Sequence, residues 1–293
     1  MAAALIVVFL ALVAATVAGG RLVASGHGQP AADTEISSAV RRRSTLLRWS
    51  GVAAGAIGAA AVALTGALGR GLLLAAPLFG VFVLAGVLAG ELSVHAPSGR
   101  TRRAAVSVRR VTDYLPRGLT SAAAIAAVTL AVLLSVTTAT GSADALGRAG
   151  RVLVRQCNSV LIEGHGPWPG SFYSIPLCVV ILAGLTAAAV ALRQVVRRPR
   201  PGDPAHLTAA DDQLRRRAAR TVIGACGVLV TVPLIGVSYV TAVGLLAFSC
   251  RPAWWAVAAW LILALIPCWI AVLAWSGLAV LAPQRSVSAA AGT

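Results

Sequence analysis

Two of the five cysteines, Cys157 and Cys250, are the residues whose type and position most clearly predict a covalent bond. The other three, Cys178, Cys226 and Cys268, lie within long apolar segments, where a thiol behaves as a small buried hydrophobe. Cys157 and Cys250 lie in two loops that the charge pattern described below assigns to the outer, oxidising side of a membrane. We therefore predict a disulfide between them, with two free thiols as the alternative.

The remaining candidate ligands and nucleophiles form no recognisable motif. The four histidines, His27, His95, His165 and His206, are not paired at ligand spacing, whereas a zinc site needs three or four clustered ligands. The sequence contains no Gly-x-Ser-x-Gly nucleophile elbow and no phosphate-binding or dinucleotide-binding glycine motif. We predict no catalytic residues, no cofactor and no metal site. Enzyme activity stays open but is not favoured.

The middle of every long apolar segment is free of ionisable side chains. Such a residue would be costly in lipid and would mark a functional site by default. The nearest one is Glu91, at the end of an apolar segment. The pattern argues against a transporter that relays protons through carboxylates and against an intramembrane metalloprotease. It leaves open a transporter that uses hydroxyls, backbone carbonyls or helices broken at proline.

The elements that carry these residues are predicted to be membrane-spanning helices. The chain is 58% hydrophobic and 12% charged, whereas about a quarter of a soluble domain is charged. A helix crosses the hydrocarbon core with about 20 apolar residues. Seven segments meet or approach this length: about 3–19, 50–68, 71–90, 119–140, 173–193, 221–248 and 252–282. We predict an all-α, seven-helix transmembrane bundle that forms a single integral membrane domain, residues 1–293.

The first apolar segment could instead be a cleaved signal peptide. A signal peptide carries basic residues before its apolar stretch, but the first basic residue of this chain, Arg21, follows it. A retained helix is therefore expected.

The last two apolar segments are longer than one crossing needs, and each contains a central proline, Pro233 and Pro267. Proline removes a backbone donor and tends to kink a helix. A kink or a tilt would fit the extra length into the bilayer. We predict kinks at both prolines.

The basic residues give the predicted orientation. The chain has a net charge of +16, and all 25 of its basic residues are arginines. In a soluble protein this charge would suggest nucleic acid as a partner, but here the arginines lie in short loops between apolar segments. Twenty of them fall on one set of alternate loops. The positive-inside rule places that set of loops in the cytoplasm. We therefore predict a protein of the plasma membrane with its N-terminus outside and its C-terminus inside the cell. Nucleic acid is not expected to bind.

One cytoplasmic loop has the pattern of an amphipathic helix. In residues 101–115, apolar side chains recur at helical spacing. The opposite face is basic and contains Arg102, Arg103, Arg109 and Arg110. We predict an interfacial helix whose arginines lie near anionic lipid headgroups at the cytoplasmic face. A simple connector is favoured over lipid sensing or the docking of a partner.

The loop 141–172 is predicted to form an ordered cap on the outer side, because residues 164–170 are rich in glycine, proline and tryptophan. Trp168 and Tyr173 are expected to anchor it at the level of the lipid headgroups, as are Trp254 and Trp260 near the last span. Residues 22–45 are predicted to be a flexible loop.

Two Gly-xxx-Gly pairs, Gly51–Gly55 and Gly86–Gly90, allow helices to approach closely. We interpret them as packing within one chain, with a dimer interface as the alternative.

Three segments, Gly71–Glu91, Arg109–Arg117 and Gly166–Leu177, carry a resemblance to uncharacterised polytopic integral membrane proteins of actinobacteria. The resemblance covers most of the chain. It implies a location in the membrane and no particular chemistry.

Two functional hypotheses follow from the sequence. The first is a non-catalytic scaffold, accessory subunit or envelope component, with lipids and a possible membrane protein as partners. The second is a small permease or exporter subunit in which Pro233 and Pro267 expose backbone to a substrate. A polar cavity at the level of these prolines would favour transport, and a tightly packed apolar interior would favour the scaffold.

Overall fold

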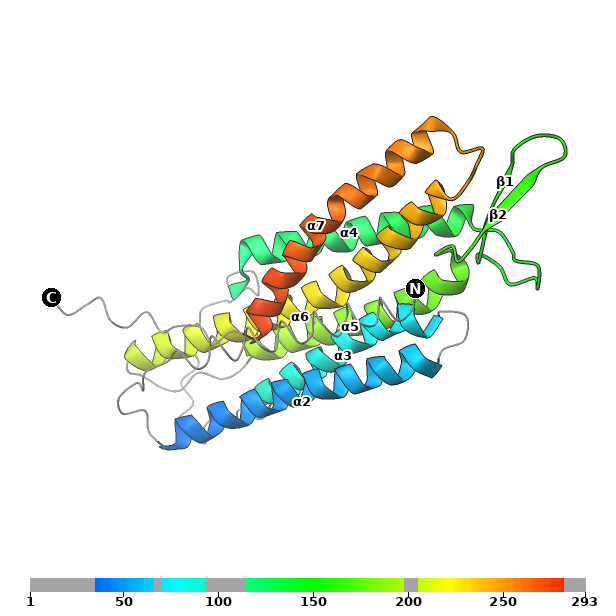
Figure 1. The fold of residues 1–293 in the computed structure, drawn as a ribbon. Helices are drawn as coiled ribbons and strands as arrows, with labels where there is room; N and C mark the ends of the chain where they lie inside the picture. Colours follow the sequence, from blue (N-terminus) through cyan, green and yellow to red (C-terminus); the bar gives the residue numbers. More distant parts are fainter. Residues whose placement is uncertain (1–34, 66–69, 93–113, 198–204, 282–293) are drawn as a thin grey trace.

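The computed structural model describes residues 35–65, 70–92, 114–197 and 205–281, and this part of the chain forms a helical bundle with one short β-hairpin (Figure 1). The described helices are α2 (Glu35–Thr65), α3 (Arg70–Leu92), α4 (Arg117–Thr140), α5 (Ser171–Arg197), α6 (Ala205–Leu246) and α7 (Ala253–Leu281). The strands are β1 (Leu153–Gln156) and β2 (Ile162–His165). The all-α prediction is correct for the bundle.

Five of these helices are long and apolar enough to cross a membrane. Their spanning parts are Leu46–Leu64, Arg117–Thr140, Ser171–Val196, Arg215–Leu246 and Ala253–Leu281. In α3 the apolar stretch reaches only from Pro77 to Gly90 among the described residues. The predicted span 3–19 lies outside the described residues, as do all but two residues of the predicted interfacial helix 101–115. The count of seven helices therefore stays a prediction.

Helix α6 lies at the centre of the bundle. Most of its spanning part is buried, and α3, α4, α5 and α7 all pack against it (Figure 1). Its buried face is mostly apolar and includes Val222, Leu229, Leu234 and Val237. It also contains buried hydroxyls, those of Thr221, Thr231, Ser238 and Thr241. The helix continues without a break from the arginine-rich segment before the sixth span into that span. It therefore extends well beyond one bilayer crossing of about 20 residues.

The helices alternate in direction, so the bundle has two distinct ends. One end, which we call the arginine-rich end, holds the start of α4, the end of α5 and the start of the α6 span, with Arg117, Arg193 and Arg216 exposed. The opposite end carries the β-hairpin and the α6–α7 loop (Figure 1). At the arginine-rich end, the Arg215 guanidinium is buried and donates hydrogen bonds to the backbone carbonyls of Val195 and Val196, at 3.3 and 2.8 Å. These carbonyls belong to the last turn of α5, where a cation complements the helix dipole.

The prediction of a flexible loop over residues 22–45 is wrong for its last part. Helix α2 begins at Glu35 and is continuous to Thr65. Residues 35–45 contain neither glycine nor proline, so no residue there interrupts the helix. Residues 22–34 lie outside the described residues.

Glycines set the distance between α2 and α3. Gly51 of α2 faces Gly86 of α3, and a Cβ added to Gly86 would lie 2.7 Å from the Leu47 carbonyl oxygen and 2.8 Å from the Gly51 Cα. These separations are too short for a side chain on either helix. One residue from each predicted Gly-xxx-Gly pair thus lies at a contact within the chain, in agreement with the prediction of packing within one chain.

We expect Gly86→Ala to destabilise the protein, because the added methyl group must push the two backbones apart. Overpacking of this kind costs about 1–3 kcal/mol. The matched control is Gly236→Ala in α6, where an added Cβ would meet no atom within 4 Å. Thermal unfolding in detergent should show a lower midpoint for Gly86→Ala than for Gly236→Ala. Equal midpoints would contradict the close contact between α2 and α3.

Candidate functional site

The connection between α4 and α5 folds into a compact cap over one end of the bundle. Strands β1 and β2 pair antiparallel, with Leu153 opposite His165 and Gln156 opposite Ile162. An isolated bridge between Ser142 and Val152 extends the hairpin toward the end of α4. The hairpin was not predicted, because its strands have only four residues each and no alternating apolar pattern.

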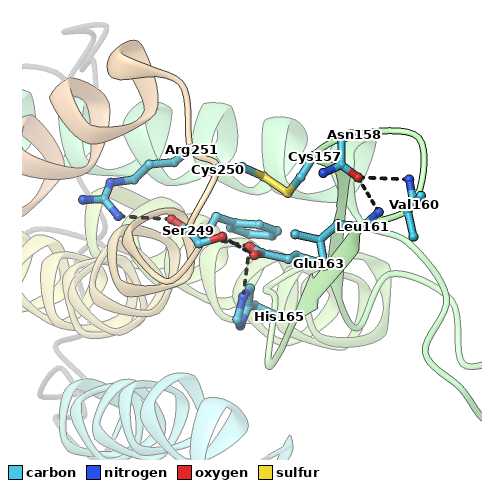
Figure 2. Close-up of a disulfide and its surroundings, with 10 residues drawn as sticks. Cys157, Asn158, Val160, Leu161, Glu163, His165, Ser249, Cys250 and Arg251 are labelled. Atoms are coloured by element: carbon cyan, nitrogen blue, oxygen red, sulfur yellow. Dashed lines mark hydrogen bonds and ion pairs between the residues drawn. A yellow bond between two sulfur atoms is a disulfide. The ribbon is translucent and has the colours of Figure 1, made fainter.

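Cys157 and Cys250 form the disulfide that the sequence predicts (Figure 2). Their Cα atoms lie 5.7 Å apart, within the usual range for a disulfide. The bond joins the end of β1 to the loop between α6 and α7, across 93 residues of sequence. It fastens the cap directly to the two helices beneath it.

Glu163 makes a second connection beside the disulfide (Figure 2). Its carboxylate accepts hydrogen bonds from the backbone N–H of Ser249, at 3.0 Å, and from the Ser249 hydroxyl. His165 lies beside it, with Nε2 3.9 Å from the carboxylate, and packs edge-on against Phe248. The hydrogen bonds from Ser249 hold the pKa of Glu163 below its ordinary value. The carboxylate therefore favours its charged form in this position.

A turn centred on Asp144 organises the other half of the cap. Its carboxylate accepts the backbone N–H groups of Leu146 and Arg148 at 3.0 Å each, and the guanidinium groups of Arg148 and Arg151 at 2.7 Å each. Burial opposes the charged carboxylate, but these donors outweigh it and hold the pKa of Asp144 well below its usual range. Gly147 closes this turn by donating its N–H to the Asp144 carbonyl at 2.9 Å, and its φ of 74° is a conformation that side chains disfavour.

Trp168 anchors the cap in the bundle. Only 3% of its surface is exposed, and its indole Nε1 donates to the Thr137 carbonyl in the last turn of α4 at 2.8 Å. Its ring lies against Gly244 of α6, where an added Cβ would come within 3.2 Å. Around it, Leu153 of the hairpin packs with apolar residues of α6 and α7, including Ala242 and Ala259.

Trp168 and Tyr173 do not face lipid headgroups, as the anchoring role expected of them would require. Both side chains are almost fully buried, because the cap folds back over the helix ends and encloses them. Trp254 and Trp260, at the start of α7, are exposed as expected of interfacial anchors. The sequence pattern could not distinguish an aromatic ring beneath a cap from one beside it.

The other residues singled out from the sequence do not converge on one site. Pro233 is buried in α6, whereas Pro267 is exposed on α7, and the backbone stays helical through both. The predicted basic face of Arg102, Arg103, Arg109 and Arg110 lies outside the described residues. Cys178, Cys226 and Cys268 are free thiols.

One group of potential metal ligands occurs within the described part of the chain. The sulfur atoms of Cys157 and Cys250 and a carboxylate oxygen of Glu163 lie within 4.8 Å of one another. A metal would need the cysteines as thiolates, and here their sulfur atoms are bonded to each other. The geometry therefore supports a structural disulfide with a neighbouring carboxylate rather than a metal centre.

Comparison with known proteins found no matching family, curated relative or solved structure.

The disulfide can be tested by counting thiols. We expect maleimide labelling of the denatured, unreduced protein to modify three cysteines, and labelling after reduction to modify all five. Cys157→Ser should leave Cys250 free and raise the unreduced count to four. It should also lower the free energy of unfolding by about 2–5 kcal/mol. Five reactive thiols in unreduced protein would contradict the bond.

The acidic residues of the cap predict sensitivity to low pH. The folded pKa values of Asp144 and Glu163 are lowered, so their stabilisation is complete above the ordinary carboxyl pKa of about 4 and is lost as the pH falls below it. We expect the unfolding midpoint, followed by tryptophan fluorescence, to fall steadily below about pH 4. Asp144→Asn should lower the midpoint at pH 7 and flatten the decline at low pH. An unchanged decline in this variant would contradict the role of Asp144.

Proposed function

We propose that this chain is a polytopic protein of the plasma membrane that serves as a non-catalytic scaffold, accessory subunit or envelope component. The main support for this proposal is the apolar packing of α6 at the level of Pro233. Five long apolar helices fit a membrane protein. The choice between a scaffold and a permease depends on how tightly side chains pack at the centre of the bundle.

The surroundings of Pro233 are apolar. One buried cluster brings together side chains from four helices: Leu130 and Leu134 of α4, Leu177 and Ile181 of α5, Val230, Leu234 and Val237 of α6, and Trp269 of α7. The nearest buried hydroxyl on α6, that of Thr231, donates to the Gly227 carbonyl of its own helix. This packing supports a closed, dry interior, and a tightly packed apolar interior favours a scaffold over a transporter.

The permease alternative has less support from the same region. It depends on broken helices at Pro233 and Pro267 that present backbone groups to a substrate. Both helices continue through their prolines, and the two prolines differ in environment, one buried and one exposed.

The proposed orientation places the cap outside and the arginine-rich end in the cytoplasm. The positive-inside rule supports it, and a disulfide in the cap fits the oxidising side. Four arginines at the cap end are engaged locally: Arg148 and Arg151 pair with Asp144, Arg155 stacks on Trp255, and Arg251 donates to backbone carbonyls. Anionic headgroups at the cytoplasmic face, including those facing the predicted helix 101–115, are the proposed lipid partners, and a protein partner in the membrane is a further possibility.

Cysteine accessibility tests both the orientation and the dry interior. In a chain with Cys178, Cys226 and Cys268 replaced by alanine, a membrane-impermeant maleimide should label Leu146→Cys in intact cells. Arg216→Cys should react only after the cells are permeabilised, and Leu234→Cys should stay unreactive in both conditions. The first two positions are exposed at opposite ends, and Leu234 is fully buried.

Different outcomes overturn different parts of the proposal. Labelling of Arg216→Cys in intact cells would reverse the orientation. Labelling of Leu234→Cys in folded protein would reveal a water-filled path at the level of Pro233, which would support the permease instead.

A further inference from the structure

An apolar pocket of about 200 Å³ lies between α4 and α5, with α6 as its floor. Helices α4 and α5 both pack against α6 but make few contacts with each other. The lining residues are Thr120, Ala123, Ala124 and Ala127 of α4, Leu185 of α5, and Ile223, Cys226 and Val230 of α6. Ala124, at the rim, is exposed on the side of the bundle that would face lipid. Small side chains on α4 therefore leave a space that neighbouring helices do not fill.

One polar group in the lining is unsatisfied. The Thr120 Oγ1 is shielded from water and has no hydrogen-bond partner among the described residues. Hydroxyls elsewhere on the exposed face of α4 are satisfied within the helix: Thr129 and Ser135 each donate to the carbonyl four residues earlier. A buried polar group without a partner is costly. Because the Thr120 hydroxyl is shielded in its present rotamer, a ligand that accepts its hydrogen bond must induce the second rotamer that threonine favours in a helix.

Exposed arginines continue the pocket toward the arginine-rich end. Arg117 lies three residues before Thr120 on α4, and Arg216 lies seven residues before Ile223 on α6. At 3.6 residues per turn, both positions fall close to the pocket-lining face of their helices. Arg193 is also exposed, about two turns beyond Leu185 on α5. The pocket thus has an apolar body, one hydroxyl near its end, and cationic side chains beyond it.

We propose that this pocket binds one anionic glycerophospholipid from the leaflet at the arginine-rich end. The sequence of chemical groups along the pocket matches that of the lipid: an acyl chain against the alanines, Leu185 and Val230, an ester carbonyl at the Thr120 hydroxyl, and a phosphate near Arg117 and Arg216. Guanidinium groups bind phosphate with charge-assisted hydrogen bonds. A soluble anion would leave the apolar body empty, and a zwitterionic lipid would place a second cation beside the arginines. The site does not depend on the scaffold role.

Native mass spectrometry of delipidated protein in detergent tests the site directly. The probes are palmitoyl-oleoyl phosphatidylglycerol and phosphatidylcholine, which share the same chains and differ in net charge. We expect one phosphatidylglycerol per chain to bind about fivefold or more tightly than phosphatidylcholine, because the choline cation offsets the attraction of the phosphate for about one arginine. Equal affinities for the two lipids would overturn the proposal.

Two matched pairs of variants locate the binding. Ala124→Phe should fill the pocket and abolish the tight site, whereas Ile125→Phe, on a different, 58% exposed face of the same turn, should retain it. Arg216→Gln should reduce the preference for phosphatidylglycerol, whereas Arg217→Gln, which removes the same charge on another face of α6, should keep it. Parallel loss in both members of either pair would show non-specific attraction to the surface and would overturn the site.

A milder substitution covers the case in which Ala124→Phe fails to fold. Thr120→Val keeps the shape of the side chain and removes the hydroxyl, so it should weaken both lipids by about threefold, the value of one hydrogen bond. Unchanged affinity in folded Thr120→Val would exclude an ester carbonyl at this position and contradict the proposed pose.

Discussion

Close packing around α6 is the constraint on which the rest of the structure depends. In lipid, helices gain no hydrophobic attraction for each other, so they associate through close van der Waals contact and hydrogen bonds. Small residues make that contact possible on several sides of α6. Gly80 of α3 lies where a Cβ would come within 2.7 Å of the Leu229 Cα, and Gly224 of α6 lies equally close to the backbone of α7 at Ser276. The central helix is therefore mostly enclosed, while α4 and α7 keep broad lipid-facing surfaces.

The cap depends on the same central helix. It is attached to α6 through the disulfide at Cys250, the hydrogen bonds of Glu163 to Ser249, and the contact of Trp168 with Gly244. These three contacts differ in physical kind, being covalent, charge-assisted and apolar. Together they bring a hairpin of two four-residue strands against the bundle, although an isolated two-stranded hairpin is only marginally stable in water. The cap is best understood as an extension of the bundle rather than as a separate domain.

The pocket between α4 and α5 forms where small residues have no helix facing them. Glycine and alanine allow helices to approach where two backbones face each other, as at Gly51 and Gly86. Where the facing helix is absent, as beside Ala123, Ala124 and Ala127, the same small residues leave a space. In the site proposed above, a lipid chain would complete the packing that the protein leaves unfinished. The arginines at one end of the bundle would then give that lipid a preferred charge.

By itself, the sequence determined that the chain has apolar helices that fit a membrane protein, the approximate positions of five of them, the charge asymmetry between the two ends and the pairing of Cys157 with Cys250. These follow from local properties: the length of apolar segments, the placement of arginines in loops, and the location of just two cysteines outside apolar segments. Only the tertiary structure decided that α6 is central, that Trp168 and Tyr173 are buried, that the loop between α4 and α5 contains a hairpin, and that Pro233 and Pro267 lie in different environments. Those features depend on which face of each helix meets another helix. In spans that are apolar all round, the residue pattern carries little information about that face, because lipid and protein interior are both apolar.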